Sequence, residues 1–267
     1  MTTQTIKRGV NLKSVALPAE HGGWGFLLEP ILLGLIVAPS GWGLLFGIGM
    51  LAAFLIHQPI KITAKDWLKH RHTDRTALAE KFMLAYGASA GLILIVVAQN
   101  KSSDFLIPLV IALPLMALQF AYDLRNDSRD LIPELAGGVA LGAIAASVAI
   151  LGGWDRNPAL ILWGLLAART IPSILYVRAR LRLEKSKPAD FLSSHLTHGL
   201  AVLMAGGLAA TDQTHWLSVV IMLVLFLRAA WGLSEYRTPA KRAAVIGMQE
   251  LGYGVFTVVV IGLGYLA

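Results

Sequence analysis

The chain has 267 residues, of which 56% are hydrophobic and only 15% are charged, and its net charge is +7. A soluble domain carries about 25% charged residues, so this composition excludes an ordinary soluble globular protein. The absence of cysteine excludes disulfides, thiolate metal sites and cysteine nucleophiles. The positive net charge is explained by basic residues that orient the chain in a membrane and attract anionic lipid headgroups. We therefore predict no nucleic-acid partner.

Nine apolar stretches approach the length of roughly 20 residues that a helix needs to cross a bilayer. They cover residues 22–39, 41–60, 81–99, 105–122, 134–152, 158–177, 191–211, 214–233 and 248–267. We therefore predict an all-α integral membrane protein with a single nine-helix transmembrane domain over residues 18–267. Residues 1–17 form a polar leader without a cleavable signal pattern.

Basic residues are distributed unequally between the connections. Of the 23 Lys and Arg residues, all but Lys101 and Arg156 fall on one side of the predicted membrane. Because Lys and Arg accumulate in cytoplasmic loops, we expect a multi-pass protein of the cytoplasmic membrane with a cytoplasmic N-terminus and an external C-terminus. The longer connections, 61–80 and 178–190, lie on the basic side, which predicts a cavity that opens to the cytoplasm.

Charged side chains inside a bilayer are costly and are functional candidates by default. Glu20 and His21 lie where the first span enters the membrane, and Glu29 lies about two turns deeper. A carboxylate at that depth is either paired with a cation or protonated. Glu29 therefore belongs either to a buried ion pair that fixes helix packing or to a polar cavity.

A ladder of basic residues recurs every four positions from the end of the second span: His57, Lys61, Lys65 and Lys69. These side chains share one face if the helix continues, and like charges at that spacing destabilise it. Asp66 lies beside this face, and Asp74 and Arg75 follow in the connection. We expect an anionic ligand, acidic groups from other loops or lipid phosphates to offset the ladder.

An acidic cluster follows the fourth span. Tyr122 is followed by three aspartates within eight residues: Asp123, Asp127 and Asp130. Carboxylate oxygens suit Mg²⁺, which is the one cofactor that the sequence brings into consideration. The same aspartates suit ion pairs with the neighbouring basic residues, and the sequence leaves both alternatives open.

The sixth span ends in a further polar constellation. Arg169, Ser173 and Tyr176 share a helical face, and Arg178 follows. Arg169 lies within the apolar stretch, where it either snorkels to the interface or holds an anion as a bidentate fork. Two other polar residues are expected to be hydrogen-bonded helix histidines, namely His195 and His198.

Residues 18–30, Pro-Ala-Glu-His-Gly-Gly-Trp-Gly-Phe-Leu-Leu-Glu-Pro, resemble the opening motif of the YwiC-like membrane protein family. The segments 77–81 and 176–180 resemble that family more loosely. The resemblance implies a membrane protein and no particular reaction.

The layout also resembles the UbiA superfamily of intramembrane prenyltransferases, which have nine helices, a cytoplasmic cavity and polar caps after helices 2 and 6. This resemblance implies a UbiA-like bundle and an isoprenoid or other lipid ligand. UbiA enzymes hold Mg²⁺ through Asp-rich motifs at the ends of those helices. Here the corresponding positions carry the ladder from His57 to Lys65 with a lone Asp66, and then Arg169 and Arg178. A two-cluster Mg²⁺–diphosphate site is therefore not expected.

We predict a polytopic membrane protein that binds an anionic membrane lipid or isoprenoid-type ligand. The expected anion-binding residues are His57, Lys61, Lys65, Arg75, Arg169, Tyr176 and Arg178. The expected polar cavity residues are Glu20, His21, Glu29, Asp66, Asp74, Tyr122, Asp123 and Asp127. Three functional classes stay open: a divergent prenyltransferase-like enzyme, a non-enzymatic transporter or lipid-binding protein, and a structural subunit of a larger membrane complex, for which the sequence gives no strong signal.

Overall fold

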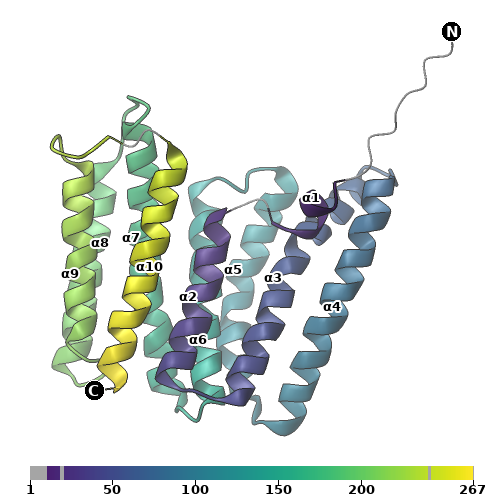
Figure 1. Cartoon of the computed structure of the whole chain (residues 1–267), viewed down its shortest axis with the longest axis horizontal. Helices are drawn as coiled ribbons and strands as arrows, with labels where there is room; N and C mark the ends of the chain where they lie inside the picture. The colour runs from purple at the N-terminus through teal and green to yellow at the C-terminus, as the bar shows by residue number, and fades with distance from the viewer. Residues whose placement is uncertain (1–10, 19–20, 240–241, 267) are drawn as a thin grey trace.

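In the computed structural model, which describes residues 11–18, 21–239 and 242–266, the chain is helical and has no strand in those ranges. Within these described ranges, nine helices of 17 residues or more lie side by side (Figure 1). They are α2 (His21–Val37), α3 (Gly41–Leu68), α4 (Asp74–Asn100), α5 (Ile107–Arg125), α6 (Leu131–Leu151), α7 (Arg156–Leu183), α8 (Phe191–Ala210), α9 (Leu217–Leu233) and α10 (Ala243–Leu266). Each apolar stretch predicted from the sequence coincides with one of them, so the all-α class is confirmed.

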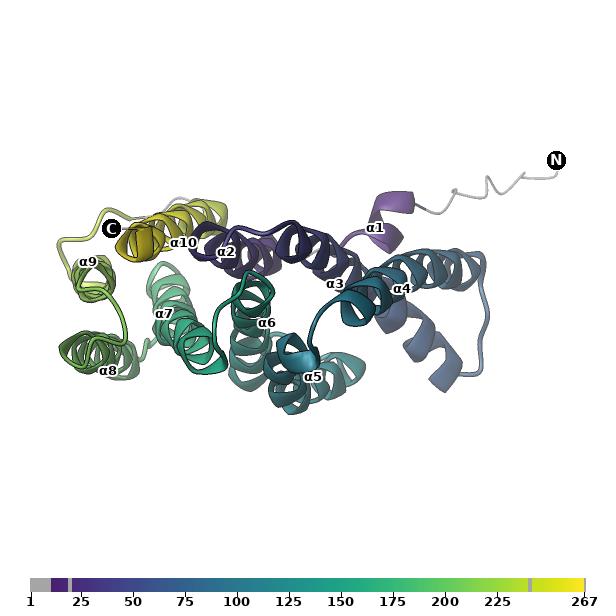
Figure 2. The same cartoon turned by 90° about the horizontal axis from the view of Figure 1, so that it is seen from below.

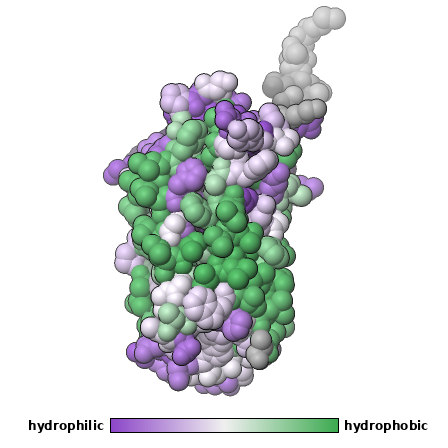
Figure 3. All heavy atoms as spheres, turned by 90° about the vertical axis from the view of Figure 1, so that its left-hand side faces the viewer, coloured by the Kyte–Doolittle hydropathy of each residue, from purple (hydrophilic) through white to green (hydrophobic). Residues whose placement is uncertain are grey.

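The outer surface of the bundle is apolar between two polar ends. Figure 3 shows a hydrophobic band that separates hydrophilic residues at the two ends of one face. Among the described residues, seven helices are long and apolar enough to cross a membrane, namely α3, α4, α5 together with the preceding 3-10 turn η1 (Ser103–Leu106), α6, α7, α8 and α10. The shorter apolar helices are α9 and the segment Gly23–Val37 of α2. These features are those of a polytopic membrane protein.

Two rows of helices make up the bundle. Seen along the helix axes, α10, α2, α3 and α4 form one row, and α8, α7, α6 and α5 form the other, with α9 at the α8 end (Figure 2). Helix α6 is the central element, because it packs against α2, α3, α5 and α7. Its small residues allow this close approach, as at Gly142, which lies against Trp163 of α7. Helix α4 packs on α3 and on a short helix, α1 (Leu12–Ala16).

The two ends of the bundle differ in charge. Helices α3, α5, α7 and α9 all finish at the end where the described N-terminal residues lie, and α10 finishes at the opposite end (Figure 1). We call the former the basic end, since the loops 69–73, 126–130 and 184–190 lie there. Lys101 and Arg156 lie at the opposite end, where Arg156 pairs with Asp104 at 2.9 Å.

Part of the predicted polar leader belongs to the fold. Residues 1–10 lie outside the described residues, but Leu12–Ala16 form α1, and its Val15 is fully buried. Val15 packs against Ile62 of α3 and Ala79 of α4. The described part of the predicted leader therefore includes a helix that packs on the α3–α4 pair.

Candidate functional site

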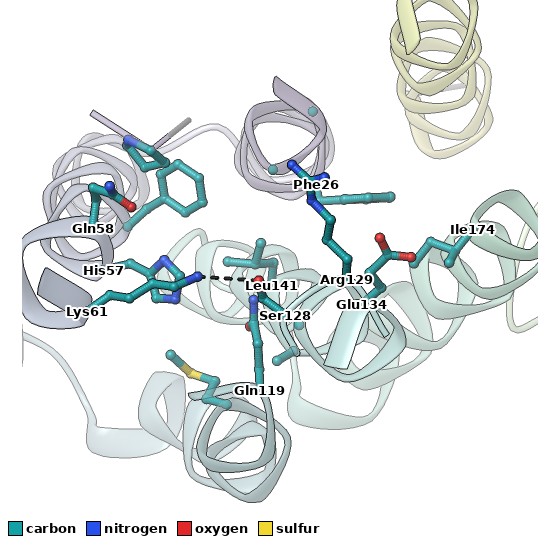
Figure 4. Close-up of a pocket in the computed structure, with 18 of the residues that line it drawn as sticks. Phe26, His57, Gln58, Lys61, Gln119, Ser128, Arg129, Glu134, Leu141 and Ile174 are labelled. Carbon is teal, nitrogen blue, oxygen red and sulfur yellow. Dashed lines mark hydrogen bonds between the residues drawn. The ribbon is translucent and has the colours of Figure 1, made fainter. Parts of the chain in front are cut away.

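A cavity of about 1230 Å³ lies between α2, α3, α5, α6, α7 and α10. His57, Lys61 and Arg169 line this one cavity, although they come from helices far apart in the sequence. Figure 4 shows His57 and Lys61 on one side of it and Ile174 of α7 on the other. Part of the wall is apolar and consists of Met50, Phe54, Leu109, Leu141 and Ile144. The lining at the basic end includes Lys65, Arg71, Arg75, Arg129, Arg178 and Arg182.

The basic ladder of α3 is offset by an aspartate from α5. Helix α3 continues to Leu68, so His57, Lys61 and Lys65 share one face. The Asp123 carboxylate lies 2.6 Å from His57 Nε2 and 2.8 Å from Lys61 Nζ. Asp123 is only 1% exposed and lies behind these two residues. Of the three ways to offset the ladder, the structure shows an acidic group from another element.

Lys65 has a neutral partner instead. Its Nζ donates to Asn126 Oδ1 at 2.6 Å, and Lys61 Nζ also donates to Ser128 Oγ at 3.4 Å. Asn126 ends α5 in the left-handed conformation, with φ of 68°, which asparagine tolerates better than most residues. The charge of Lys65 is therefore not neutralised by a carboxylate within the described residues.

Asp66 holds the turn between α3 and α4. Its carboxylate accepts from Arg71 Nε at 2.7 Å and from Thr76 Oγ1 at 2.6 Å. Thr73 and Thr76 form a reciprocal capping box at the start of α4. Both Asp66 oxygens are thus committed to the turn, although the residue also lines the cavity.

Deeper in the bundle, a chain of four charges links four helices. Arg169 Nη2 of α7 lies 3.1 Å from Glu29 Oε1 of α2 and donates to the Glu250 carbonyl of α10 at 3.2 Å. The Glu250 side chain pairs with Arg228 Nη1 of α9 at 2.5 Å. Glu29 is 5% exposed and Arg169 is 2% exposed. Glu29 therefore belongs to a buried ion pair and also lines the cavity, so the two alternatives for it do not exclude each other.

Glu250 and Arg228 were missed as candidates from the sequence. Both lie inside predicted spans, at residues 248–267 and 214–233, so the rule that singled out Glu29 and Arg169 applies to them equally. The guanidinium of Arg228 lies over the rings of Tyr176 and Tyr253, at 4.1 and 4.9 Å from their centroids.

Gly254 of α10 allows the Glu29–Arg169 pair to form, because a Cβ at this position would overlap both side chains. We expect Gly254→Ala to lower the free energy of unfolding by about 1–3 kcal/mol, as overpacking does. Gly252→Ala is the matched control, since a Cβ there meets nothing within 4 Å. Thermal unfolding of the purified variants in one detergent measures the difference. Equal stability of the two variants would contradict the close packing at Gly254.

The remaining predicted residues take different positions. Arg178 lines the cavity and pairs with Glu134 at 2.7 Å. Tyr176 contacts Arg228 and does not line the cavity. Three others also lie outside the lining, namely Asp74, Tyr122 and Asp127. Glu20 and the side chain of His21 lie outside the described residues.

The aspartates considered for Mg²⁺ do not form a cation site. Asp123 is engaged by His57 and Lys61, and Asp127 and Asp130 are exposed. In the part of the chain that the structure describes, no three His, Cys, Asp or Glu side chains are placed to hold a metal ion. These three aspartates do not fit a divalent cation.

The two helix histidines are hydrogen-bonded as predicted. His195 Nδ1 lies 2.6 Å from the Phe191 carbonyl, and His198 Nδ1 lies 2.7 Å from the Ser194 carbonyl.

Comparisons with known proteins agree with the opening motif. A family model described as YwiC-like protein matches residues 17–150. The chain is also 25% identical over 183 residues to a Bacillus subtilis (strain 168) protein described as "Uncharacterized protein YwiC", over 66% of this chain and 72% of that protein. No solved structure matches the chain, so the likeness to the UbiA superfamily stays a resemblance. The family match includes Glu29 and the Lys61–Asp123 pair, but not Arg169.

Proposed function

This chain belongs to the YwiC-like protein family, and we propose that it binds an anionic amphiphile in the cavity between its helices. The ligand is a lipid or isoprenoid-type molecule whose headgroup lies at the basic end and whose chain lies against the apolar wall. Family membership brings no reaction with it, so the proposal rests on the chemistry of the cavity.

The observation that carries the proposal is a surplus of positive charge at one end of the cavity. Four basic lining residues form no ion pair with a carboxylate among the described residues: Lys65, Arg75, Arg129 and Arg182. Lys and Arg form strong charge-assisted hydrogen bonds with phosphate and carboxylate oxygens. An anionic headgroup supplies the negative charge that these side chains lack.

The apolar wall supports a ligand with a hydrocarbon chain. Met50 and Phe54 of α3 line this wall together with Leu141 and Ile144 of α6, and Leu109 of α5 adds to it. Cavities of this kind bind ligands mainly through apolar contact, with a few polar groups that fix orientation. A small hydrophilic anion would leave this wall unused.

The orientation of the protein follows from the same charges. Lys and Arg accumulate on the cytoplasmic side of membrane proteins, so the basic end faces the cytoplasm and the C-terminus is external. The cavity then opens toward the cytoplasm from within the cytoplasmic membrane. A headgroup in the inner leaflet meets Lys65 and Arg75 at that level.

Binding or transfer of the ligand is favoured over prenyl transfer. The buried carboxylates beside the cavity are already paired with cations, Asp123 with Lys61 and Glu29 with Arg169. A metal that assists a diphosphate leaving group needs free oxygen ligands. What the cavity can still do without such a metal is bind an anion through its Lys and Arg side chains.

Hexadecyl phosphate is a suitable probe, with hexadecanol as its uncharged counterpart. We expect protein in nanodiscs of neutral lipid to bind hexadecyl phosphate, and Lys65→Gln to weaken this binding about tenfold through loss of one charge-assisted contact. Lys69→Gln is the matched control, because Lys69 is one turn further along, exposed and outside the lining. Titration of the two probes against each variant measures the effect.

Three results would contradict the proposal. They are equal affinity for hexadecyl phosphate and hexadecanol, an equal effect of Lys65→Gln and Lys69→Gln, and the absence of any binding. Mass spectrometry of lipids that copurify with the protein gives an independent reading. It should find an anionic amphiphile that is depleted in Lys65→Gln.

A further inference from the structure

Two residues of α7 that line the cavity each carry a polar atom without a partner in the described part of the chain. Arg169 Nε and Ser173 Oγ are buried and have no hydrogen-bond partner among the described residues. Both residues are 2% exposed, and both line the cavity. They lie one helical turn apart on the same face of α7, where side chains four positions apart are neighbours.

Unpartnered buried polar atoms are uncommon, because each one costs the free energy of its lost hydration. Other such atoms in the described residues belong to side chains outside the cavity lining, including Thr63, Ser194 and His198. Among the described residues, Arg169 and Ser173 are the two that both line the cavity and carry a buried unpartnered atom. A ligand in the cavity can therefore supply what they lack.

We propose that Arg169 and Ser173 form an inner subsite for a neutral acceptor oxygen of the ligand, such as a ketone or ester carbonyl. The inference rests on the proposed function and adds a second polar group to the ligand. Arg169 Nε donates one hydrogen bond and the Ser173 hydroxyl donates another, so a single oxygen satisfies both.

The charges around the subsite explain why the oxygen is neutral. Arg169 and Arg228 are matched by Glu29 and Glu250, so this chain of charges sums to zero. The carboxylates of Glu29 and Glu250 belong to residues that also line the cavity, and they would repel a second anion. At the basic end, by contrast, Lys65 has no carboxylate partner among the described residues.

The position of the subsite sets the spacing of the two ligand groups. Arg178 and Arg182 lie on α7 toward the basic end. At about 1.5 Å per residue, Ser173 lies roughly 13 Å from Arg182 along the helix axis. The neutral oxygen is therefore carried on the hydrocarbon chain, well away from the anionic headgroup.

A series of hexadecyl phosphates, each with one ketone at a different chain position, tests the subsite. We expect one ketone position to bind the wild-type protein about three- to tenfold more tightly than plain hexadecyl phosphate, as one or two net hydrogen bonds provide. Ser173→Ala should reduce this preference, measured as the ratio of the two affinities in the same variant, to under twofold. Ser173→Thr, which keeps the hydroxyl, should retain it.

Ser147→Ala on α6 is the matched control, since Ser147 is fully buried, donates to the Ala143 carbonyl and lies outside the lining. It should leave the ketone preference unchanged. If no ketone position is preferred, or if the preference survives Ser173→Ala, the inner subsite is overturned and the anion site stands. If plain hexadecyl phosphate fails to bind the wild-type protein, both proposals are overturned.

Discussion

Replacing Asp123 with alanine is expected to lower the free energy of unfolding by about 3 kcal/mol, which is typical of a broken buried ion pair. The change removes the acceptor of both His57 and Lys61, whose nitrogens lie within 2.8 Å of the carboxylate. The ladder of α3 then carries uncompensated positive charge beside an apolar wall. We place the effect at the lower end of the usual range because the Lys61 side chain keeps 18% of its exposure.

Denaturant or thermal unfolding in a fixed detergent measures the loss, with Asp127→Ala as the control. Asp127 lies four residues further on and is exposed, so its removal should change the free energy of unfolding by no more than about 0.5 kcal/mol. A second change provides a sharper comparison. Adding Lys61→Met to Asp123→Ala should recover most of the loss, since it removes the stranded charge. Equal stability of Asp123→Ala and Asp127→Ala would show that the pair does not support the α3–α5 contact.

The charge ladder shows how far the sequence leads toward the site. The spacing of His57, Lys61 and Lys65 predicts a common helix face, and repulsion along that face requires an opposite charge. Which residue provides that charge is a matter of tertiary packing. Helix α5 must return beside α3 before Asp123 can reach Lys61, and no local pattern in the sequence encodes this contact.

The chain of four charges between α2, α7, α9 and α10 shows a different reason why the sequence predicts the site incompletely. The rule that charges at membrane depth are functional candidates identifies Glu29 and Arg169, and it applies equally to Glu250 and Arg228. Glu250 lies near the start of its predicted span, where a charge is readily taken for an interfacial one. Its role depends on α10 packing beside α2, which brings the C-terminal helix against the first long helix of the chain.

Tyr176 shows that a shared helix face does not guarantee a shared environment. Its spacing from Arg169 and Ser173 is helical, as the sequence indicates. At Ser173 this face of α7 lines the cavity. About one turn further along, the same face packs against α9 instead. There Tyr176 contacts Arg228, and a Cβ on Gly232 would overlap the Tyr176 hydroxyl. Periodicity gives the direction of a side chain, and the neighbouring helix at each level decides what it contacts.

Replacing Glu29 with alanine is expected to cost about 3–5 kcal/mol of the free energy of unfolding, since it leaves a fully buried guanidinium without its carboxylate. Arg169 is 2% exposed, and it keeps uncharged contacts with the Glu250 carbonyl and the Phe26 ring. Removing both charges, with Glu29→Gln and Arg169→Met together, should recover stability to within about 2 kcal/mol of the wild-type protein, because uncharged residues of similar volume replace buried ion pairs well. Glu235→Ala, at an exposed loop position, is the control and should be near neutral.

The double variant Glu29→Gln with Arg169→Met also separates the effect on stability from the effect on ligand binding. It keeps the Lys65 end of the cavity and should still bind plain hexadecyl phosphate, but it lacks the Arg169 donor and should lose much of the ketone preference. A double variant as unstable as Glu29→Ala would mean that packing at Gly254, and not the stranded charge, sets the cost. Full recovery of stability together with a lost preference would assign the Glu29–Arg169 pair to positioning a donor at the cavity wall, rather than to holding α2 and α7 together.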